Sequence, residues 1–194
     1  MTVSNVNIYG LDESVRGAKF PMSVDTNTLN CEVTKGINAL GNAEQGSGHD
    51  NFLNGIIVQF DLTCSNKMWV EMERYHFIDF VSSQSTMHKA AHMDFAKCFN
   101  GYVTARTMIE CNRLKAAYQE DPSAENYLRL LYNHPVGFKL TAGMTTNYQQ
   151  LKTIYQQRKT HRLPEWKAFC KWIETLPYAK ELICYEEKEN EIKE

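Results

Sequence analysis

The hydrophobic and polar positions of this chain follow a period of two in a few short stretches, and these stretches predict its strands. Residues 4–9 alternate polar and apolar side chains, as in a half-buried strand. Residues 56–62 are rich in β-branched and apolar side chains, which is typical of a central strand. Residues 136–142 are a third strand candidate. We therefore expect a small sheet.

Longer stretches follow the helical period. Between residues 90 and 119, apolar side chains recur every three or four positions, which predicts one long helix. Asp121-Pro122 would end it, and Ser123 would cap a second helix that runs to residue 132. The polar run 41–48 predicts a loop. Further helices are expected near residues 31–40, 67–77, 146–159 and 164–174, and Ser65 or Asn66 could cap the second of these.

Together these elements predict an α+β fold, in which a small mixed or antiparallel sheet packs with long helices. A chain of 194 residues can bury a core without disulfides or metal ions. We expect one domain over residues 1–185 and a charged tail over residues 186–194.

Composition and charge narrow the function classes. Six cysteines without a CxxC pair disfavour a structural zinc site, and we expect no metal. The formal net charge of −2 disfavours a protein that binds duplex nucleic acid. No apolar run nears the ~20 residues that span a bilayer, and no signal peptide is evident. We expect a cytoplasmic protein with reduced thiols and no membrane partner.

Candidate chemistry lies in a set of polar segments. They read GHDNF at residues 48–52, RYH at 74–76, SSQS at 82–85 and NYQQL at 147–151, with Arg158 further along. Arginine, histidine, amide and hydroxyl groups of this kind can hold a phosphate and a planar heterocycle. No nucleophile–base pair stands out beside them, so we expect no catalytic side chain. The pattern favours a nucleotide or cofactor binder.

Two of these residues have a plainer interpretation beside the functional one. Arg74 offers a rigid fork that matches phosphate oxygens, or it forms a surface ion pair with Glu71 or Asp79. His49 follows a Gly-Ser-Gly hinge that lets it approach a ligand, or it is a solvated loop residue.

The remaining segments are open in the same way. Residues 82–86 would cradle a phosphate if they open the long helix, whereas ordinary capping needs only one hydroxyl. Arg158 contacts a nucleotide, or it satisfies the carbonyl groups at a helix end. Asn147 and Gln149 present amides to a ring edge, or Asn147 caps a helix.

The order and spacing of these segments resemble the flavin-dependent thymidylate synthases, which methylate deoxyuridine monophosphate (dUMP) with reduced flavin. His49 falls on the family's histidine, Phe60 on its strand phenylalanine and Arg74 on the first arginine of its Arg-His-Arg triplet. Asn147-x-Gln149-x-Leu151 followed by Arg158 has the spacing of the family's C-terminal helix. The resemblance covers residues 45–90 and 136–178.

The resemblance implies a ligand set and an assembly. FAD would be the cofactor, NADPH and methylenetetrahydrofolate the cosubstrates, and a pyrimidine nucleotide the substrate. Sites in the family form between subunits of a homotetramer, so we expect a homo-oligomer. The implied cofactor-binding residues are His49, Asn51, Arg74, Tyr75, His76, Asn147 and Gln149. The implied substrate-binding residues are Glu71, Arg74, Ser83, Gln84, Ser85 and Arg158.

Several positions depart from the family pattern. Asn54-Gly55 replaces a Glu-His pair, and Tyr75-His76 replaces the rest of the triplet. We expect a thymidylate synthase-like enzyme that transfers a one-carbon unit to a pyrimidine deoxynucleotide monophosphate. The alternative is a repurposed, non-catalytic homologue that binds a nucleotide. A helical interaction protein without a small ligand would explain the helices but not the collinear polar segments.

Overall fold

The structure is a computed structural model that describes residues 1–44 and 46–184. The chain divides into two compact units, and each is described by itself. Unit 1 comprises Met1–Asn5 and Phe60–Met144, and unit 2 comprises Val6–Gln59 and Thr145–Glu194. The charged tail expected over residues 186–194 lies outside the described residues.

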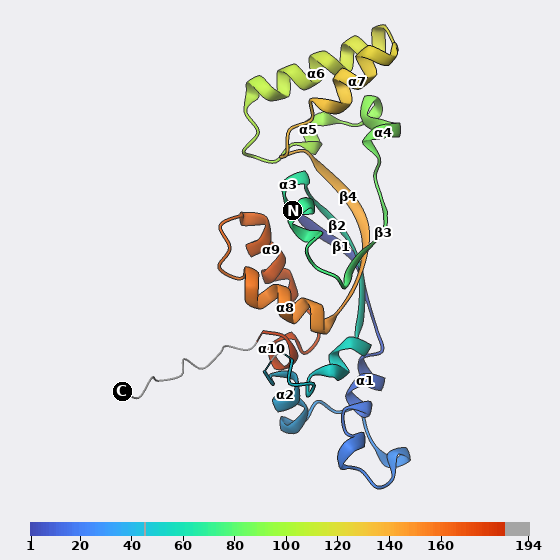
Figure 1. The fold of residues 1–194 in the computed structure, drawn as a ribbon, viewed down its shortest axis with the longest axis vertical. Helices are drawn as coiled ribbons and strands as arrows, with labels where there is room; N and C mark the ends of the chain where they lie inside the picture. The colour runs from blue at the N-terminus through green and yellow to red at the C-terminus, as the bar shows by residue number, and fades with distance from the viewer. Residues whose placement is uncertain (45, 185–194) are drawn as a thin grey trace, which may run out of the picture. The chain divides into compact units, whose positions relative to one another are not determined.

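One antiparallel sheet of four strands is present in the described part of the chain (Figure 1). Its order is β1-β2-β4-β3, and the boundary between the units falls within β1, β2 and β4. The strands are β1 Thr2–Tyr9, β2 Ile57–Ser65, β3 Ile78–Ser83 and β4 Lys139–Asn147. The predicted α+β class is confirmed, and β3 is a strand that the sequence pattern did not indicate.

The strand expected over residues 136–142 begins later than predicted. The carbonyl groups of residues 136 and 138 accept hydrogen bonds from the start of α3 (Asn66–Met72) instead of from a neighbouring strand. Val136 O accepts from Lys67 N, and Phe138 O accepts from Asn66 N. The regular ladder therefore starts at β4, where the Thr141 and Thr63 hydroxyls lie 2.7 Å apart across β4 and β2.

The helices of unit 1 correct the long helix expected over residues 90–119. Instead of one helix, this stretch holds short pieces followed by one helix of 16 residues. The breaks occur at Asp94 and Thr104, which both have an extended backbone. The Asp94 side chain accepts from Ala96 N, the Thr104 side chain accepts from Thr107 N, and each thereby caps the helix that follows. The pieces are α4 Thr86–Lys89, η4 Ala90–His92, α5 Phe95–Cys98 and α6 Ala105–Glu120.

The apolar period wrongly predicted one helix because these separate elements all bury apolar side chains in the same core. Phe95, Phe99 and Phe138 pack edge to face, with ring centroids 5.4 to 5.9 Å apart. Cys111 and Leu114 on α6 are buried in the same cluster. A stripe that is continuous in the sequence is thus made of separate elements around one aromatic cluster.

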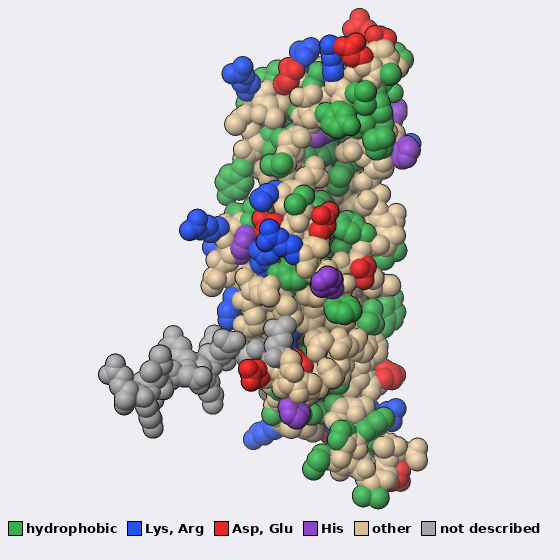
Figure 2. Space-filling model, viewed as in Figure 1, with side chains coloured by type: hydrophobic (Ala, Val, Ile, Leu, Met, Phe, Trp, Pro, Cys, Tyr) green, Lys and Arg blue, Asp and Glu red, His purple; other side chains and the backbone are tan. Residues whose placement is uncertain are grey.

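Unit 1 also contains a helical hairpin. Helix α6 is followed by α7 (Ala124–Tyr132), and Ser123 caps α7 as predicted. The two helices lie side by side in Figure 1, and this end of the molecule carries acidic and basic side chains next to each other in Figure 2. These charges include the pairs Arg113–Glu110 and Arg129–Glu125. Such exposed pairs contribute little to stability.

Unit 2 contains the N-terminal helices and the C-terminal part of the chain. Helices α8 and α9, which the sequence predicted, pack against each other in Figure 1. Tyr148, Leu151 and Trp166 are completely buried, and the Tyr148 hydroxyl donates to Pro177 O over 2.8 Å. Its elements are α1 Leu11–Gly17, η1 Phe20–Met22, η2 Thr26–Thr28, α2 Lys35–Gly41, η3 Asn51–Gly55, α8 Tyr148–Arg158, α9 Pro164–Ile173 and α10 Ala179–Leu182.

The remaining helix of unit 1, α3 (Asn66–Met72), is capped by Ser65, one of the two capping residues that the sequence suggested. It is shorter than the predicted helix 67–77, because the chain turns at residues 73–74 and 76–77 before β3. None of the described helices combines the length and the apolar character that crossing a membrane requires.

Candidate functional site

Two neighbouring pockets hollow the N-terminal part of unit 2. The first, of about 530 Å³, lies between η1, η2 and α2, and we call it the Lys19 pocket. The second, of about 700 Å³, lies between α1, η1 and the start of η3, and we call it the His49 pocket. The pockets share Ala18, Met22 and Leu40, so they adjoin.

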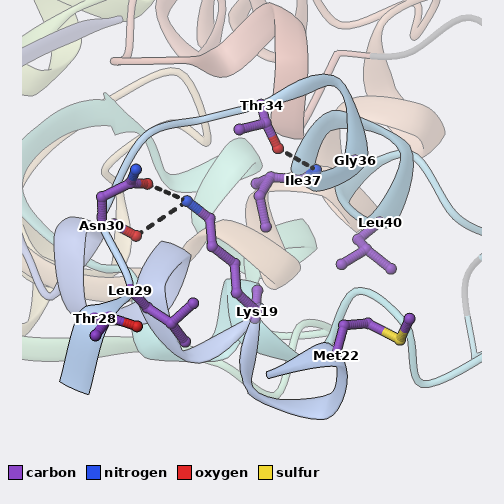
Figure 3. Close-up of a pocket in the computed structure, with 10 residues that line it drawn as sticks. Lys19, Met22, Thr28, Leu29, Asn30, Thr34, Gly36, Ile37 and Leu40 are labelled. Carbon is purple, nitrogen blue, oxygen red and sulfur yellow. Dashed lines mark hydrogen bonds between the residues drawn. The ribbon is translucent and has the colours of Figure 1, made fainter. Parts of the chain in front are cut away.

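The Lys19 pocket combines one cation with an apolar wall. Leu29 lines it from the segment after η2, and Ile37 and Leu40 line it from α2 (Figure 3). The Lys19 ammonium donates to Asn30 O over 3.0 Å and to Asn30 Oδ1 over 2.6 Å, which fixes its position at the wall (Figure 3). The pocket therefore offers apolar contact and a positive charge that is already hydrogen-bonded.

The His49 pocket brings together a predicted pair of site residues. His49 and Asn51 line it together with the hydroxyl-bearing Ser14 of α1. The pocket also has apolar residues, among them Phe52 and Pro21. This mixture of polar groups and apolar wall is typical of small-molecule sites.

Glycine shapes the rim of this pocket. Gly48 has a φ of 79°, a left-handed conformation that residues with a side chain rarely adopt, and it directly precedes His49. Gly10, at the N-cap of α1, lies so close to Gly55 that a Cβ there would collide with the Gly55 carbonyl. Gly48 therefore lets the loop that carries His49 turn tightly, and Gly10 lets the start of α1 approach the end of η3.

A buried ion pair holds the loop that carries His49 against α8. Asp50 follows His49 and is 1% exposed, and its Oδ2 lies 2.7 Å from Lys152 Nζ on α8. Gln149, a predicted site residue one turn earlier, donates to Asp50 Oδ1 over 3.2 Å. Both carboxylate oxygens of Asp50 are therefore paired, and Gln149 acts on the loop.

Asn147 confirms the capping interpretation. Its side chain accepts from Gln150 N over 2.8 Å at the start of α8, and it is 9% exposed. The next residue, Tyr148, donates its backbone N–H to Ile56 O over 3.0 Å. Asn147 therefore sets where α8 begins and ties it to the chain just before β2.

Unit 1 holds the predicted arginine and its neighbours. Arg74 is exposed in the turn after α3, and its guanidinium has no hydrogen bond or ion pair with the described residues. The suggested ion pair with Glu71 or Asp79 is not formed: no ion pair joins Arg74 to either carboxylate among the described residues, and Glu71 pairs with Lys67 at 3.0 Å. Tyr75 is buried, at 9% exposed, while His76 is exposed.

The segment expected to cradle a phosphate, residues 82–86, does not open a long helix. Ser83 ends β3, and the helix that follows, α4, has only four residues instead of thirty. Ser85 is at its N-cap but forms no capping side-chain hydrogen bond. Gln84 is occupied, because its Oε1 accepts from Thr141 N and its N donates to Thr141 O, both over 2.9 Å. Gln84 thus extends the sheet.

Arg158 lies in the last turn of α8, as predicted. Its guanidinium carbon is 4.7 Å from the centre of the Trp166 ring on α9. A cation over a tryptophan face is attracted by the ring and helps the two helices to pack. Arg158 therefore has a structural role whatever ligand it also contacts.

No protein-family model and no curated protein matches the chain. Solved structures do match, and two are of the flavin-dependent thymidylate synthase ThyX from Helicobacter pylori, each with FAD and dUMP. One is 18% identical with a TM-score of 0.73, and the match covers 94% of this chain and 98% of that one. The other is 16% identical with a TM-score of 0.75, covering 94% and 97%.

The chain has the fold of the flavin-dependent thymidylate synthases. The resemblance seen in the sequence is therefore confirmed at the level of the fold. The match spans nearly the whole chain, including the segment 91–135 that the sequence resemblance left out.

Four of the described thiols in this thymidylate synthase fold have a raised pKa. Burial raises the pKa of Cys170 and of Cys184 to about 12, and it also raises the pKa of Cys98 and Cys111. A thiol with a raised pKa carries little thiolate at neutral pH. The described residues also contain no cluster of three or more His, Cys, Asp or Glu side chains that could hold a metal.

The residue that sequence reasoning missed is Lys152. A signal was present, because Lys152 follows Leu151 and lies four residues after Tyr148, on the face of α8 that the apolar residues bury. A lysine on such a face requires an anionic partner. The sequence does not say which carboxylate that is.

Proposed function

We propose that this protein is a flavin-dependent enzyme that transfers a one-carbon unit to a pyrimidine deoxynucleotide monophosphate. The observation that carries the proposal is the His49 pocket, in a fold whose solved examples hold FAD and dUMP. The raised pKa of Cys170 and Cys184 gives no support to a nucleophilic role for these two thiols, which agrees with chemistry that a cofactor supplies.

The His49 pocket fits part of a flavin. Its volume of about 700 Å³ is within the range of small-molecule sites. Phe52 and Leu40 provide apolar contact for a planar ring, while His49 and Asn51 provide hydrogen-bonding groups at the rim. Bound FAD would supply hydride transfer, and these residues would bind and orient it. Asn147 and Gln149 would act indirectly, by placing α8 and the loop.

Arg74 is the residue we assign to the nucleotide phosphate. Its guanidinium is exposed and unpaired with the described residues, and it offers a fork that matches two phosphate oxygens. Glu71, Ser83, Ser85 and Arg158 remain proposed substrate contacts, as Tyr75 and His76 remain proposed cofactor contacts. NADPH and methylenetetrahydrofolate would be the cosubstrates, and a cytoplasmic location stays a prediction.

A homotetramer with sites shared between subunits is part of this proposal. This part of the proposal depends on the family resemblance. Exposed apolar side chains such as Ile109 and Tyr132, at 69% and 83% exposed, agree with an interface. Light scattering that gives the monomer mass of 22.4 kDa at micromolar concentration would exclude it.

One observation favours the alternative, a nucleotide-binding homologue without flavin chemistry. Gln84 is held by Thr141 and Tyr75 is buried, so two predicted site residues already have structural roles. A protein that lost part of its ligand set could keep the fold and a single nucleotide contact.

Flavin absorbance separates these possibilities. We expect the purified protein to show the flavin bands, natively or after FAD is added, and to oxidise NADPH in a dUMP-dependent reaction with methylenetetrahydrofolate. The His49→Ala variant should bind FAD more weakly, while Lys167→Ala, an exposed substitution on α9, should not. Binding of dUMP without flavin would support the alternative. Binding of neither would refute both.

A further inference from the structure

The Asp50–Lys152 pair is buried more deeply than its chemistry alone would favour. The two side chains are 1% and 3% exposed, and Nζ lies 2.7 Å from Oδ2. Moving both charges out of water costs about as much as their attraction returns, so a pair of apolar residues could pack equally well. Stability is therefore a poor explanation for these residues, and a role in specifying one geometry is a better one.

Lys152 binds the chain at two points on either side of His49. Besides Asp50, its ammonium donates to the Ala43 carbonyl over 2.8 Å, where α2 has just ended. Gln149 adds a third hydrogen bond, to Asp50 Oδ1. One face of α8 therefore holds both Ala43 and Asp50, the residues at which the polar loop starts and ends.

The loop needs such an anchor because its own backbone is permissive. Gly46 and Gly48 have φ values of 87° and 79°, and glycine reaches many other conformations at little cost. His49 itself is exposed, and its backbone N–H donates to Ser47 Oγ over 3.4 Å, with no side-chain hydrogen bond to the described residues. Its place at the rim of the pocket thus depends on the residue that follows it.

We propose that Lys152 and Asp50 are positioning residues that hold His49 at the rim of the His49 pocket for ligand binding. Lys152 also neutralises the Asp50 carboxylate, so His49 presents its ring to a ligand without competition from an adjacent unpaired anion. This inference depends on the proposed function for the identity of the ligand, but the anchoring of the loop does not.

The test uses Lys152→Met, Asp50→Asn and the double variant, with Lys167→Met as an exposed control on α9. Each protein is titrated with FAD and with dUMP, and its melting temperature is measured. Lys152→Met leaves a buried carboxylate unpaired, so it should be the least stable. The double variant removes both charges and should recover most of the melting temperature. Its FAD affinity should stay at least about tenfold below that of the unmodified protein, a difference of about 1.4 kcal/mol.

Recovery of both stability and affinity in the double variant would overturn the proposal, since the pair would then be structural only. If the unmodified protein binds neither FAD nor dUMP, the proposed function fails while the anchoring is still tested. Hydrogen exchange of the amides of residues 46–51 should then be at least about tenfold faster in the double variant, at equal global stability. Unchanged exchange would refute the anchoring itself.

Discussion

Two buried regions of the molecule differ in the kind of interaction that holds them. One is the core of the helical part of unit 1, and the other is the interior next to the His49 pocket in unit 2. The first is a cluster of aromatic rings, Phe95, Phe99 and Phe138, packed edge to face, and Lys115 Nζ lies 4.9 Å from the centre of the Phe95 ring. The second is a buried ammonium and a buried carboxylate with two further hydrogen bonds. Apolar burial stabilises in proportion to area and has little direction. A buried ion pair has little net stabilising effect but permits one geometry.

The difference matters for where function can be built. An aromatic cluster tolerates small shifts of its rings, because dispersion is the sum of many weak contacts. The hydrogen bonds of Lys152 at 2.7 and 2.8 Å tolerate almost none. A loop that must present one side chain to a ligand is thus better held by the second kind of interior.

The largest effect should come from the aromatic cluster. Phe138→Ala removes a completely buried ring and should cost about 3–5 kcal/mol of the free energy of unfolding, measured with urea. FAD affinity should change less than about twofold in the fraction that stays folded. Tyr102→Ala, at a side chain 82% exposed, is the control and should stay within about 0.5 kcal/mol. A loss of affinity without a loss of stability would contradict the division of roles.

Arg74→Ala should weaken ligand binding and leave the stability of the protein unchanged. Loss of a charge-assisted contact to a phosphate should weaken dUMP binding by about 1.5–3 kcal/mol, about ten- to a hundredfold. The melting temperature should not change, because Arg74 is exposed and has no partner among the described residues. Calorimetry of Arg106→Ala, another exposed arginine of unit 1, provides the control. Affinity within about twofold of the unmodified protein would show that the phosphate binds elsewhere.

Two N-caps sharpen the contrast at a smaller scale. Ser123 caps α7 in unit 1, and Asn147 caps α8 in unit 2. Alanine at either position should cost about 1 kcal/mol of stability in chemical denaturation. Only Asn147→Ala should also weaken FAD binding, because α8 carries Gln149 and Lys152 toward the loop. Equal affinities in the two variants would mean that the start of α8 does not affect the pocket.

The smallest effect is a pH dependence located in unit 1. His134 packs against Phe138 with ring centres 4.5 Å apart and the rings tilted by 59°, and its Nε2 has no hydrogen-bond partner among the described residues. Burial lowers its pKa below the ordinary 6.5, although Nδ1 contacts Leu131 O. The folded state therefore prefers the neutral ring. Its contribution is fully present above pH 6.5 and is lost as the pH falls through that value toward the lower folded pKa.

The measurement is a comparison of denaturation midpoints between about pH 7 and about pH 5. The unmodified protein should lose more stability on acidification than His134→Phe, which cannot be protonated. Parallel curves for the two proteins would show that His134 is hydrated and does not resist protonation.

Local signals in the sequence predicted the elements that depend on few neighbours. The caps at Ser65 and Ser123 and the strands β1 and β2 follow from patterns within a few residues. The same reasoning failed over residues 90–119, where several short elements share one apolar period because they surround one core. It also missed β3, whose residues are mostly exposed and therefore show no alternation of buried and polar positions.

What the sequence by itself determined is the α+β composition, the polar segments and their order along the chain. Only the tertiary structure decided which of these segments meet. Lys152 and Asp50 are separated by 102 positions, and Gln84 and Thr141 by 57. The choice of such partners depends on how strands and helices pack, since a hydrogen bond needs two atoms within about 3 Å. The residue types indicate that a hydrogen-bond or ion-pair partner is needed, and the fold determines which residue that partner is.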